Sequence, residues 1–187
     1  MKRYLILLLV ALAVSAGAAA RQPERGYRGF VEWSNSLRSM SYDDDWRINQ
    51  YYTGVSTSHG YQINPTYFVG GGLDWVYWHG GASHIMAFFA QGRADFKFND
   101  RFTPFADVRL GYNVAMNGGV YFSPSIGYRF NWGRKVGLNA GLGMTVQGYS
   151  ENTFDVVTGP EGYVSFWKTG KRHSAIAFFS FRIGIDF

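Results

Sequence analysis

The strongest constraint on the fold is an alternation of apolar and polar residues that recurs along most of the chain. In residues 136–146, for instance, every second residue is apolar and the residues between are small or polar. Successive side chains of a β-strand point in opposite directions, so a period of two is typical of a strand with two unlike faces. The pattern marks the segments 26–34, 51–63, 67–77, 84–98, 102–112, 120–130, 136–146 and 175–187. The sequence therefore predicts an all-β protein with eight strands.

The composition of the two faces favours a membrane barrel. Each segment has the roughly 9–11 residues of a tilted membrane strand, and aromatic residues gather near both ends of the apolar face. One expected belt is Tyr27, Tyr61, Tyr67, Phe102, Tyr128, Phe130 and Phe187, and the other is Trp33, Tyr51, Trp75, Tyr77, Tyr112 and Phe122. The opposite face is rich in glycine and poor in Lys and Glu, which suits a narrow interior. We expect an eight-stranded antiparallel up-and-down transmembrane β-barrel. The alternative is a soluble β-sandwich or lipocalin-like barrel.

The start of the chain has the layout of a secretory signal peptide. Lys2 and Arg3 are followed by an apolar run over 5–14 and by the small residues 18–20. The run is shorter than the roughly 20 residues of a membrane-spanning helix. We expect a signal peptide at 1–20, a short lead at 21–25 and the barrel domain at 26–187.

The connections between the predicted strands alternate between long and short. The longest are 34–50 and 148–174, and tight turns rich in Asn, Asp, Pro and Gly lie at the opposite end. Long loops are typical of the outer surface and short turns of the periplasmic side, so both termini are expected in the periplasm. Trp46, Phe166 and Trp167 in the long loops would contact lipopolysaccharide or another surface ligand, or pack on each other. The carboxylates of 43–45 would bind Ca²⁺ or form a solvated loop.

The chain ends in a strand of alternating aromatic and aliphatic residues that finishes on phenylalanine. This end resembles the assembly signal of bacterial outer-membrane proteins, with Phe179, Phe181, Ile183, Ile185 and Phe187 as its apolar positions. Together with eight strands and a signal peptide, the chain resembles small outer-membrane barrels of the OmpA-transmembrane or OmpX type. The resemblance implies residence in the outer membrane, contact with its lipids and lipopolysaccharide, and insertion by the barrel assembly machinery. Pro124 departs from the pattern, and we expect it at a β-bulge or above the bilayer.

The inward face carries charges that need partners. Burying an isolated charge in a narrow interior is costly, so pairing is expected. We expect Arg93 and Asp95 to face Asp107 and Arg109, and Arg182 to lie near Glu32, so that replacing Arg182 by methionine lowers the melting temperature. The whole set is Arg28, Glu32, Asp74, Arg93, Asp95, Asp107, Arg109, Arg129 and Arg182. It forms either a structural plug or the gate of a charged pore.

Other functional classes have weaker support in the sequence. The absence of cysteine excludes disulfides, thiol nucleophiles and thiolate zinc sites. The four histidines lack the His-x-Ser-Asn arrangement of outer-membrane lipid A deacylases, so we expect no catalytic site, cofactor or metal. Basic residues are scattered despite the net charge of +5, so no nucleic-acid partner is expected. A structural or surface-interaction role is the main hypothesis. A small-solute channel is the second, and a lipid-modifying enzyme is the third.

Overall fold

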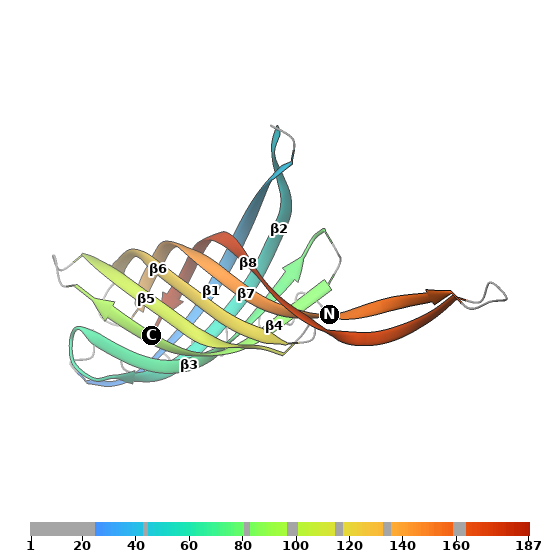
Figure 1. Cartoon of the computed structure of the whole chain (residues 1–187). Helices are drawn as coiled ribbons and strands as arrows, with labels where there is room; N and C mark the ends of the chain where they lie inside the picture. The colour runs from blue at the N-terminus through green and yellow to red at the C-terminus, as the bar shows by residue number, and fades with distance from the viewer. Residues whose placement is uncertain are drawn as a thin grey trace, which may run out of the picture.

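The strands close into a single barrel (Figure 1). A computed structural model describes residues 25–42, 45–80, 83–96, 101–114, 118–132, 136–158 and 164–187. The strands are β1 Gly26–Tyr42, β2 Asp45–Gln62, β3 Tyr67–Trp78, β4 Ser83–Asp95, β5 Phe102–Asn113, β6 Gly119–Trp132, β7 Val136–Thr158 and β8 Val164–Asp186. Each strand pairs antiparallel with its neighbours in sequence, and β8 returns to β1. The predicted all-β fold with eight antiparallel strands is confirmed.

The seam between β1 and β8 defines the two ends of the barrel. Pairing runs from Phe30 opposite Asp186 to Leu37 opposite Phe179. Two main-chain hydrogen bonds of 2.9 and 3.1 Å between Gly29 and Phe187 extend it. The beginning of β1 and the end of β8 therefore lie together at one end, here named the terminal end. The hairpin connections after β1, β3, β5 and β7 lie at the opposite loop end.

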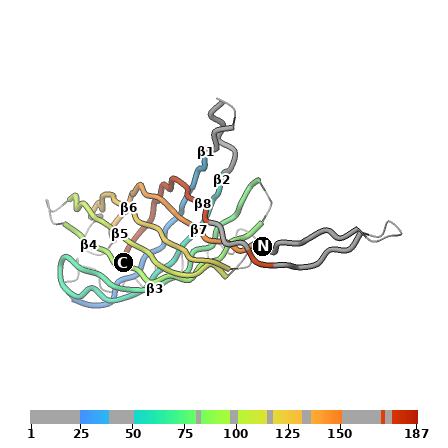
Figure 2. The backbone as a smooth tube through the Cα atoms, viewed as in Figure 1, coloured from blue at the N-terminus to red at the C-terminus, as the bar shows by residue number. Residues whose placement is uncertain are grey.

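Two hairpins project from the loop end, β1–β2 and β7–β8 (Figure 1). Figure 2 traces the backbone around the barrel from the same viewpoint. The prediction of long loops at 34–50 and 148–174 is wrong, because most of these residues belong to strands. Only 43–44 and 159–163 separate the strands, and they lie outside the described residues. In these stretches several polar residues follow one another, as in 150–153 and 171–174. The apolar alternation that reveals a half-buried strand is consequently lost there.

The barrel has an apolar exterior and a polar interior. Exposed residues on the outer wall include Ile126, Leu142 and Phe179, and Phe179 is 71% exposed. Buried inward positions are held by arginines, carboxylates, serines and glutamines. A β-sandwich is excluded by the closed topology, and a lipocalin-like barrel would keep its apolar face inside. Within the described ranges, no helix is long and apolar enough to cross a bilayer.

Two residues depart from the predicted aromatic belts. Tyr77 is only partly exposed, and Phe187 is buried, with 8% of its surface exposed. The Phe187 ring lies over Gly29, where a Cβ atom would come within 2.7 Å of it. It also packs edge-on against His59, with ring centroids 6.5 Å apart. The ring therefore fills a notch on the outward side of the seam, between Gly29 and His59, and it is buried there instead of exposed with the rest of the belt.

Pro124 is accommodated without a bulge. The register is the same on both sides of it, with Phe122 opposite Val146 and Ser125 opposite Gly143. Pairing between β6 and β7 lapses between these positions, and the hydroxyl of Ser123 lies 3.0 Å from the carbonyl oxygen of Met144. Proline brings no N–H to the ladder, and the neighbouring serine supplies a donor instead. The predicted bulge is therefore wrong.

The hydrogen bond from the Ser123 hydroxyl to the Met144 carbonyl predicts the effect of Ser123→Ala. Loss of the hydroxyl leaves the Met144 carbonyl without this donor, which should cost about 1–3 kcal/mol of unfolding free energy. Urea titration of the barrel refolded in vesicles measures the change. Adding Pro124→Ala restores a main-chain N–H and should recover part of the loss. A double variant less stable than Ser123→Ala would contradict this account.

Candidate functional site

A network of buried charges fills the terminal end of the lumen. Arg28 bonds Asp186 through Nε at 3.0 Å and also bonds Asp95. Arg93 donates to Asp95 at 2.8 Å, and Arg129 donates to Asp186 at 2.8 Å. Gln62 and Asn139 complete this terminal network, each with a hydrogen bond of 2.8–2.9 Å to one of its charged members. The network links strands far apart in sequence, because Asp186 on β8 receives donors from β1, β6 and β7.

A second network lies at the middle of the lumen. Arg109 crosses the barrel from β5 to ion-pair with Glu32 on β1. Its Nε lies 3.2 Å from Asp107, and Nη1 of Arg182 lies 3.7 Å from the same carboxylate. Gln91 also donates to Asp107. This central network consists of Glu32, Gln91, Asp107, Arg109 and Arg182, and it ties β1 to β4, β5 and β8.

The predicted partners inside the lumen are partly wrong. Among the described residues, Glu32 ion-pairs with Arg109 rather than Arg182. The register places Arg182 opposite Ser34, one inward position closer to the loop end than Glu32, and its guanidinium bonds Ser123. The expected ion pairs between β4 and β5, of Arg93 with Asp107 and of Asp95 with Arg109, are also absent among the described residues.

On those two strands, each arginine bonds a carboxylate two residues away on its own strand. Arg93 is directed away from Asp107 by aromatic packing. Its guanidinium carbon lies 3.6 Å from the ring centre of Phe105 and 5.0 Å from that of Phe30. Stacking over these rings stabilises the cation within the narrow interior. Alternation along the strands therefore indicates which face a charge occupies, and aromatic packing helps to select its partner.

Asp74 stands apart from both networks. It has no arginine within ion-pairing distance among the described residues, and it accepts a hydrogen bond of 2.8 Å from the hydroxyl of Tyr121. Its Oδ1 atom is buried without a hydrogen-bond partner. All nine charged residues predicted from sequence are buried in the lumen. Asp74 is the one that lacks an ion-pair partner.

Asp186 and Tyr121 are two lumen residues that were not predicted from the sequence as partners of the charges. Asp186 is the fifth buried carboxylate, and it balances five buried arginines among the described residues. Tyr121 supplies the hydrogen bond to Asp74. Both share the inward parity of their strands, Asp186 with Arg182 and Tyr121 with Ser123. Strict use of the alternation would have identified them.

Apolar side chains close the lumen toward the loop end. Tyr52, Val76, Ile85 and Phe178 form a buried cluster. The ring centroids of Tyr52 and Phe178 are 4.5 Å apart, and Trp78 and Ile176 pack against the group. This apolar plug lies beyond the charged networks, next to the β3–β4 connection. The plug could not be predicted from the sequence, because its members come from four separate strands.

Phenylalanine rings and glycines fill the rest of the interior. The Phe105 ring lies against Gly127 and Gly141, where added Cβ atoms would come within 2.7 and 3.2 Å of it. Phe68 lies in the same way over Gly60 and Gly70. A hollow beside Asp74 has a volume of about 10 Å³, roughly the space of one water molecule. The lumen is therefore packed around its charges.

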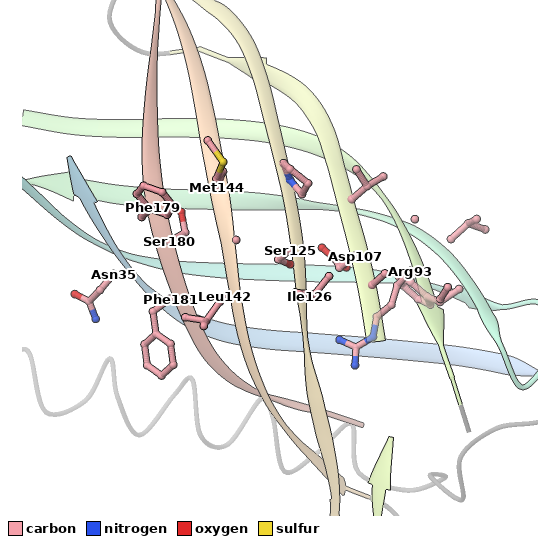
Figure 3. A pocket seen from close by; sticks show the side chains of 18 of the residues that line it. Asn35, Arg93, Asp107, Ser125, Ile126, Leu142, Met144, Phe179, Ser180 and Phe181 are labelled. Carbon is pink, nitrogen blue, oxygen red and sulfur yellow. The ribbon is translucent and has the colours of Figure 1, made fainter. Parts of the chain in front are cut away.

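A larger hollow lies against the outer wall (Figure 3). Its lining includes the exposed side chains of Ile126, Leu142, Met144, Phe179 and Phe181, from β6, β7 and β8. These residues belong to the apolar exterior. Arg93, Asp107 and Ser125, whose side chains are buried, also line the hollow, so it is bounded by both exposed and buried residues.

Several predicted features fall outside the described residues. These are the signal peptide and the lead at 1–24, and the carboxylates of Asp43 and Asp44. The structure also does not describe five side chains in the projecting hairpins, those of Asp45, Trp46, Phe166, Trp167 and His173. Among the described residues, no three His, Cys, Asp or Glu side chains are grouped as metal ligands. The C-terminal positions Phe179, Phe181 and Ile183 are exposed on the outer wall, Ile185 is partly exposed and Phe187 fills its notch.

Comparison with known proteins yields a similarity of fold. No family model and no curated protein matches this sequence. One similar solved structure comes from work described as de novo design of transmembrane beta-barrels. It shares 12% sequence identity, covers 90% of this chain and 98% of its own chain, and superimposes with a TM-score of 0.49.

Proposed function

We propose that this protein is an integral outer-membrane β-barrel with a structural or surface-interaction role and a plugged lumen. The observation that carries the proposal is the inversion of polarity, with apolar residues outside and charges inside. A continuous exposed apolar wall in water would be an aggregation liability, whereas a bilayer solvates it. Closure also satisfies the main-chain hydrogen bonds that lipid cannot satisfy. The apolar residues at the barrel exterior are thus placed for contact with lipid acyl chains.

The orientation and the assembly route belong to the same proposal. The short connections at the terminal end suit the periplasm, and the projecting hairpins suit the outer surface. Phe179, Phe181 and Ile183 present apolar side chains on the last strand, consistent with an assembly signal read by the barrel assembly machinery. The surface partner would meet the ends of the β1–β2 and β7–β8 hairpins. We assign the protein no catalytic activity and no cofactor.

The membrane assignment is tested with lipids brominated along their acyl chains, which quench nearby tryptophans. Trp33 and Trp75 are exposed on the outer wall. The barrel refolded in such vesicles should lose fluorescence, and the loss should fall when both are replaced by phenylalanine. A heat-shifted gel band certifies folding of each sample. A folded protein whose fluorescence is the same in brominated and ordinary lipid would refute the assignment.

Because the lumen is plugged, we expect the folded protein not to conduct ions across a planar bilayer. The central network and the apolar plug occupy the path of any solute, so the folded chain should give no unitary conductance steps in a planar bilayer. An open channel-forming barrel measured in the same apparatus provides the positive control. Reproducible steps from the folded chain would instead support the small-solute channel, with the paired charges as its gate.

A further inference from the structure

A row of aromatic and imidazole rings in contact with one another crosses the outer wall near the loop end. It runs from Tyr51 through His79, Tyr77 and His84 to Trp75, with successive centroid distances of 4.8, 4.9, 5.1 and 5.3 Å. Tyr51 lies on β2, Trp75 and Tyr77 on β3 and His84 on β4, and His79 follows β3 directly. Both histidines are exposed. We name these five residues the histidine row.

The imidazole nitrogens of this row have spare capacity for a ligand. Trp75 covers a face of the His84 ring, with an angle of 15° between the ring planes, so the nitrogens lie at the uncovered edge. None of the described residues hydrogen-bonds to them. Among the same residues, the His79 imidazole makes one hydrogen bond, between its Nε2 and Oγ1 of Thr53 at 3.2 Å.

The third described histidine differs from these two. At the terminal end, Nδ1 of His59 lies 2.6 Å from the hydroxyl of Tyr27, and Nε2 lies 3.0 Å from that of Thr57. Both nitrogens of His59 are therefore engaged by neighbouring side chains. His59 is an exterior imidazole that also packs on aromatic rings, and it serves as a matched control for the histidine row.

The row lies where lipid headgroups would lie. Tyr51 and Trp75 are members of the exposed aromatic belt at the loop end, and such belts sit at headgroup depth. Imidazole N–H groups donate to anionic oxygens, and such hydrogen bonds are stronger than neutral ones. The described outward side chains of β2, β3 and β4 include no carboxylate that would repel an anion.

We propose that the histidine row binds a phosphate group of an anionic lipid in the leaflet at the loop end, with His84 and His79 as donors. The proposal rests on the proposed membrane function. It assigns the lipid contact to specific polar side chains, separate from the general apolar wall. Trp75 stacks on the His84 ring, and Tyr77 contacts His79 edge-on. These contacts restrict the orientation of both imidazole rings and limit the freedom lost when a headgroup binds.

The test uses the barrel refolded in maltoside micelles, which contain no phosphate. Imidazole NMR signals are followed while lipid A is added, then lipid A with its phosphates removed, and then inorganic phosphate. We expect lipid A to shift the signals of His84 and His79 and to leave that of His59 in place. Equal shifts with the dephosphorylated lipid, or with inorganic phosphate at the same concentration, would overturn the proposal.

Affinity for lipid A is then compared between variants. His79→Gln with His84→Gln should bind at least about tenfold more weakly, as expected for lost hydrogen bonds to a charged group. His59→Gln should retain wild-type affinity. Unchanged binding by the double variant would refute the site, and if that variant does not fold, the wild-type NMR titration decides. A wild-type chain that folds in neither micelles nor vesicles would refute the membrane function itself, and this inference with it.

Discussion

Replacing Arg109 by methionine is expected to destabilise the folded barrel by about 3–5 kcal/mol, the usual cost of removing one partner from a buried ion pair. Arg109 ion-pairs with both Glu32 and Asp107. Methionine fills a similar volume without the charge, so the loss would come from two carboxylates that lose their principal cation. The measurement is the unfolding free energy in urea, with folded protein in vesicles identified by its heat-shifted gel band.

Three further variants make the Arg109 result specific. Arg25→Met removes an exposed cation and should change the stability by less than about 0.5 kcal/mol. Adding Glu32→Gln to Arg109→Met should recover part of the loss, because one unpaired carboxylate becomes neutral. Arg182→Met should be milder than Arg109→Met, because Arg182 lies 3.7 Å from Asp107 and does not ion-pair with Glu32. Equal losses from Arg109→Met and Arg182→Met would contradict this assignment of partners.

Substituting Gly127 by alanine is expected to cost about 3 kcal/mol, the upper end of the usual overpacking range, and to lower the folding yield. The added Cβ atom would collide with the carbonyl oxygen of Ala140 and come within 2.7 Å of the Gly141 Cα atom and the Phe105 ring. Two of these contacts are with main-chain atoms of β7, which cannot move without breaking the ladder. The fraction of protein in the heat-shifted band, followed by urea titration, measures the effect.

Gly92→Ala is the matched control for Gly127→Ala. Gly92 also lies within a strand, on β4, but the nearest atom to an added Cβ is a methyl carbon of Val108 at 3.9 Å. This substitution should leave the folding yield unchanged. If both alanine variants fold equally well, close packing of strand against strand at Gly127 does not limit stability.

The alternation of residues predicts which face each side chain occupies, because in a strand this depends on local geometry alone. It placed Glu32, Arg109 and Asp74 on the inward face before any partner was known. It could not predict that Arg109 ion-pairs with Glu32, or that Asp74 accepts a hydrogen bond from Tyr121. Those contacts span the lumen between strands that are distant in sequence. Partner choice depends on the depth of each residue along the barrel and on the aromatic rings beside it.

The prediction failed for the loops for a different reason. Periodicity is a signal of contrasting environments, and adjacent apolar residues such as Val156 and Val157, or Phe166 and Trp167, interrupt the alternation in the projecting parts of β7 and β8. The treatment of Pro124 failed because a proline usually interrupts pairing by a bulge, whereas here the adjacent Ser123 supplies the donor. Alternation as a strand signal and bulges as a response to proline are both valid local rules. Here the surroundings of the strands determined whether each rule applied.

The contacts of Asp186 have a consequence for the order in which the barrel assembles. Asp186 is the penultimate residue of the chain, and it is a partner of Arg28 from the first strand and of Arg129 from the sixth. Until β8 is in place, both guanidiniums lack this counter-charge and partly assembled sheets bear an electrostatic penalty. Closure of the barrel is therefore cooperative, because Asp186 on β8 neutralises cations that precede it on β1 and β6. A chain truncated before this point would lack the means to complete its own interior.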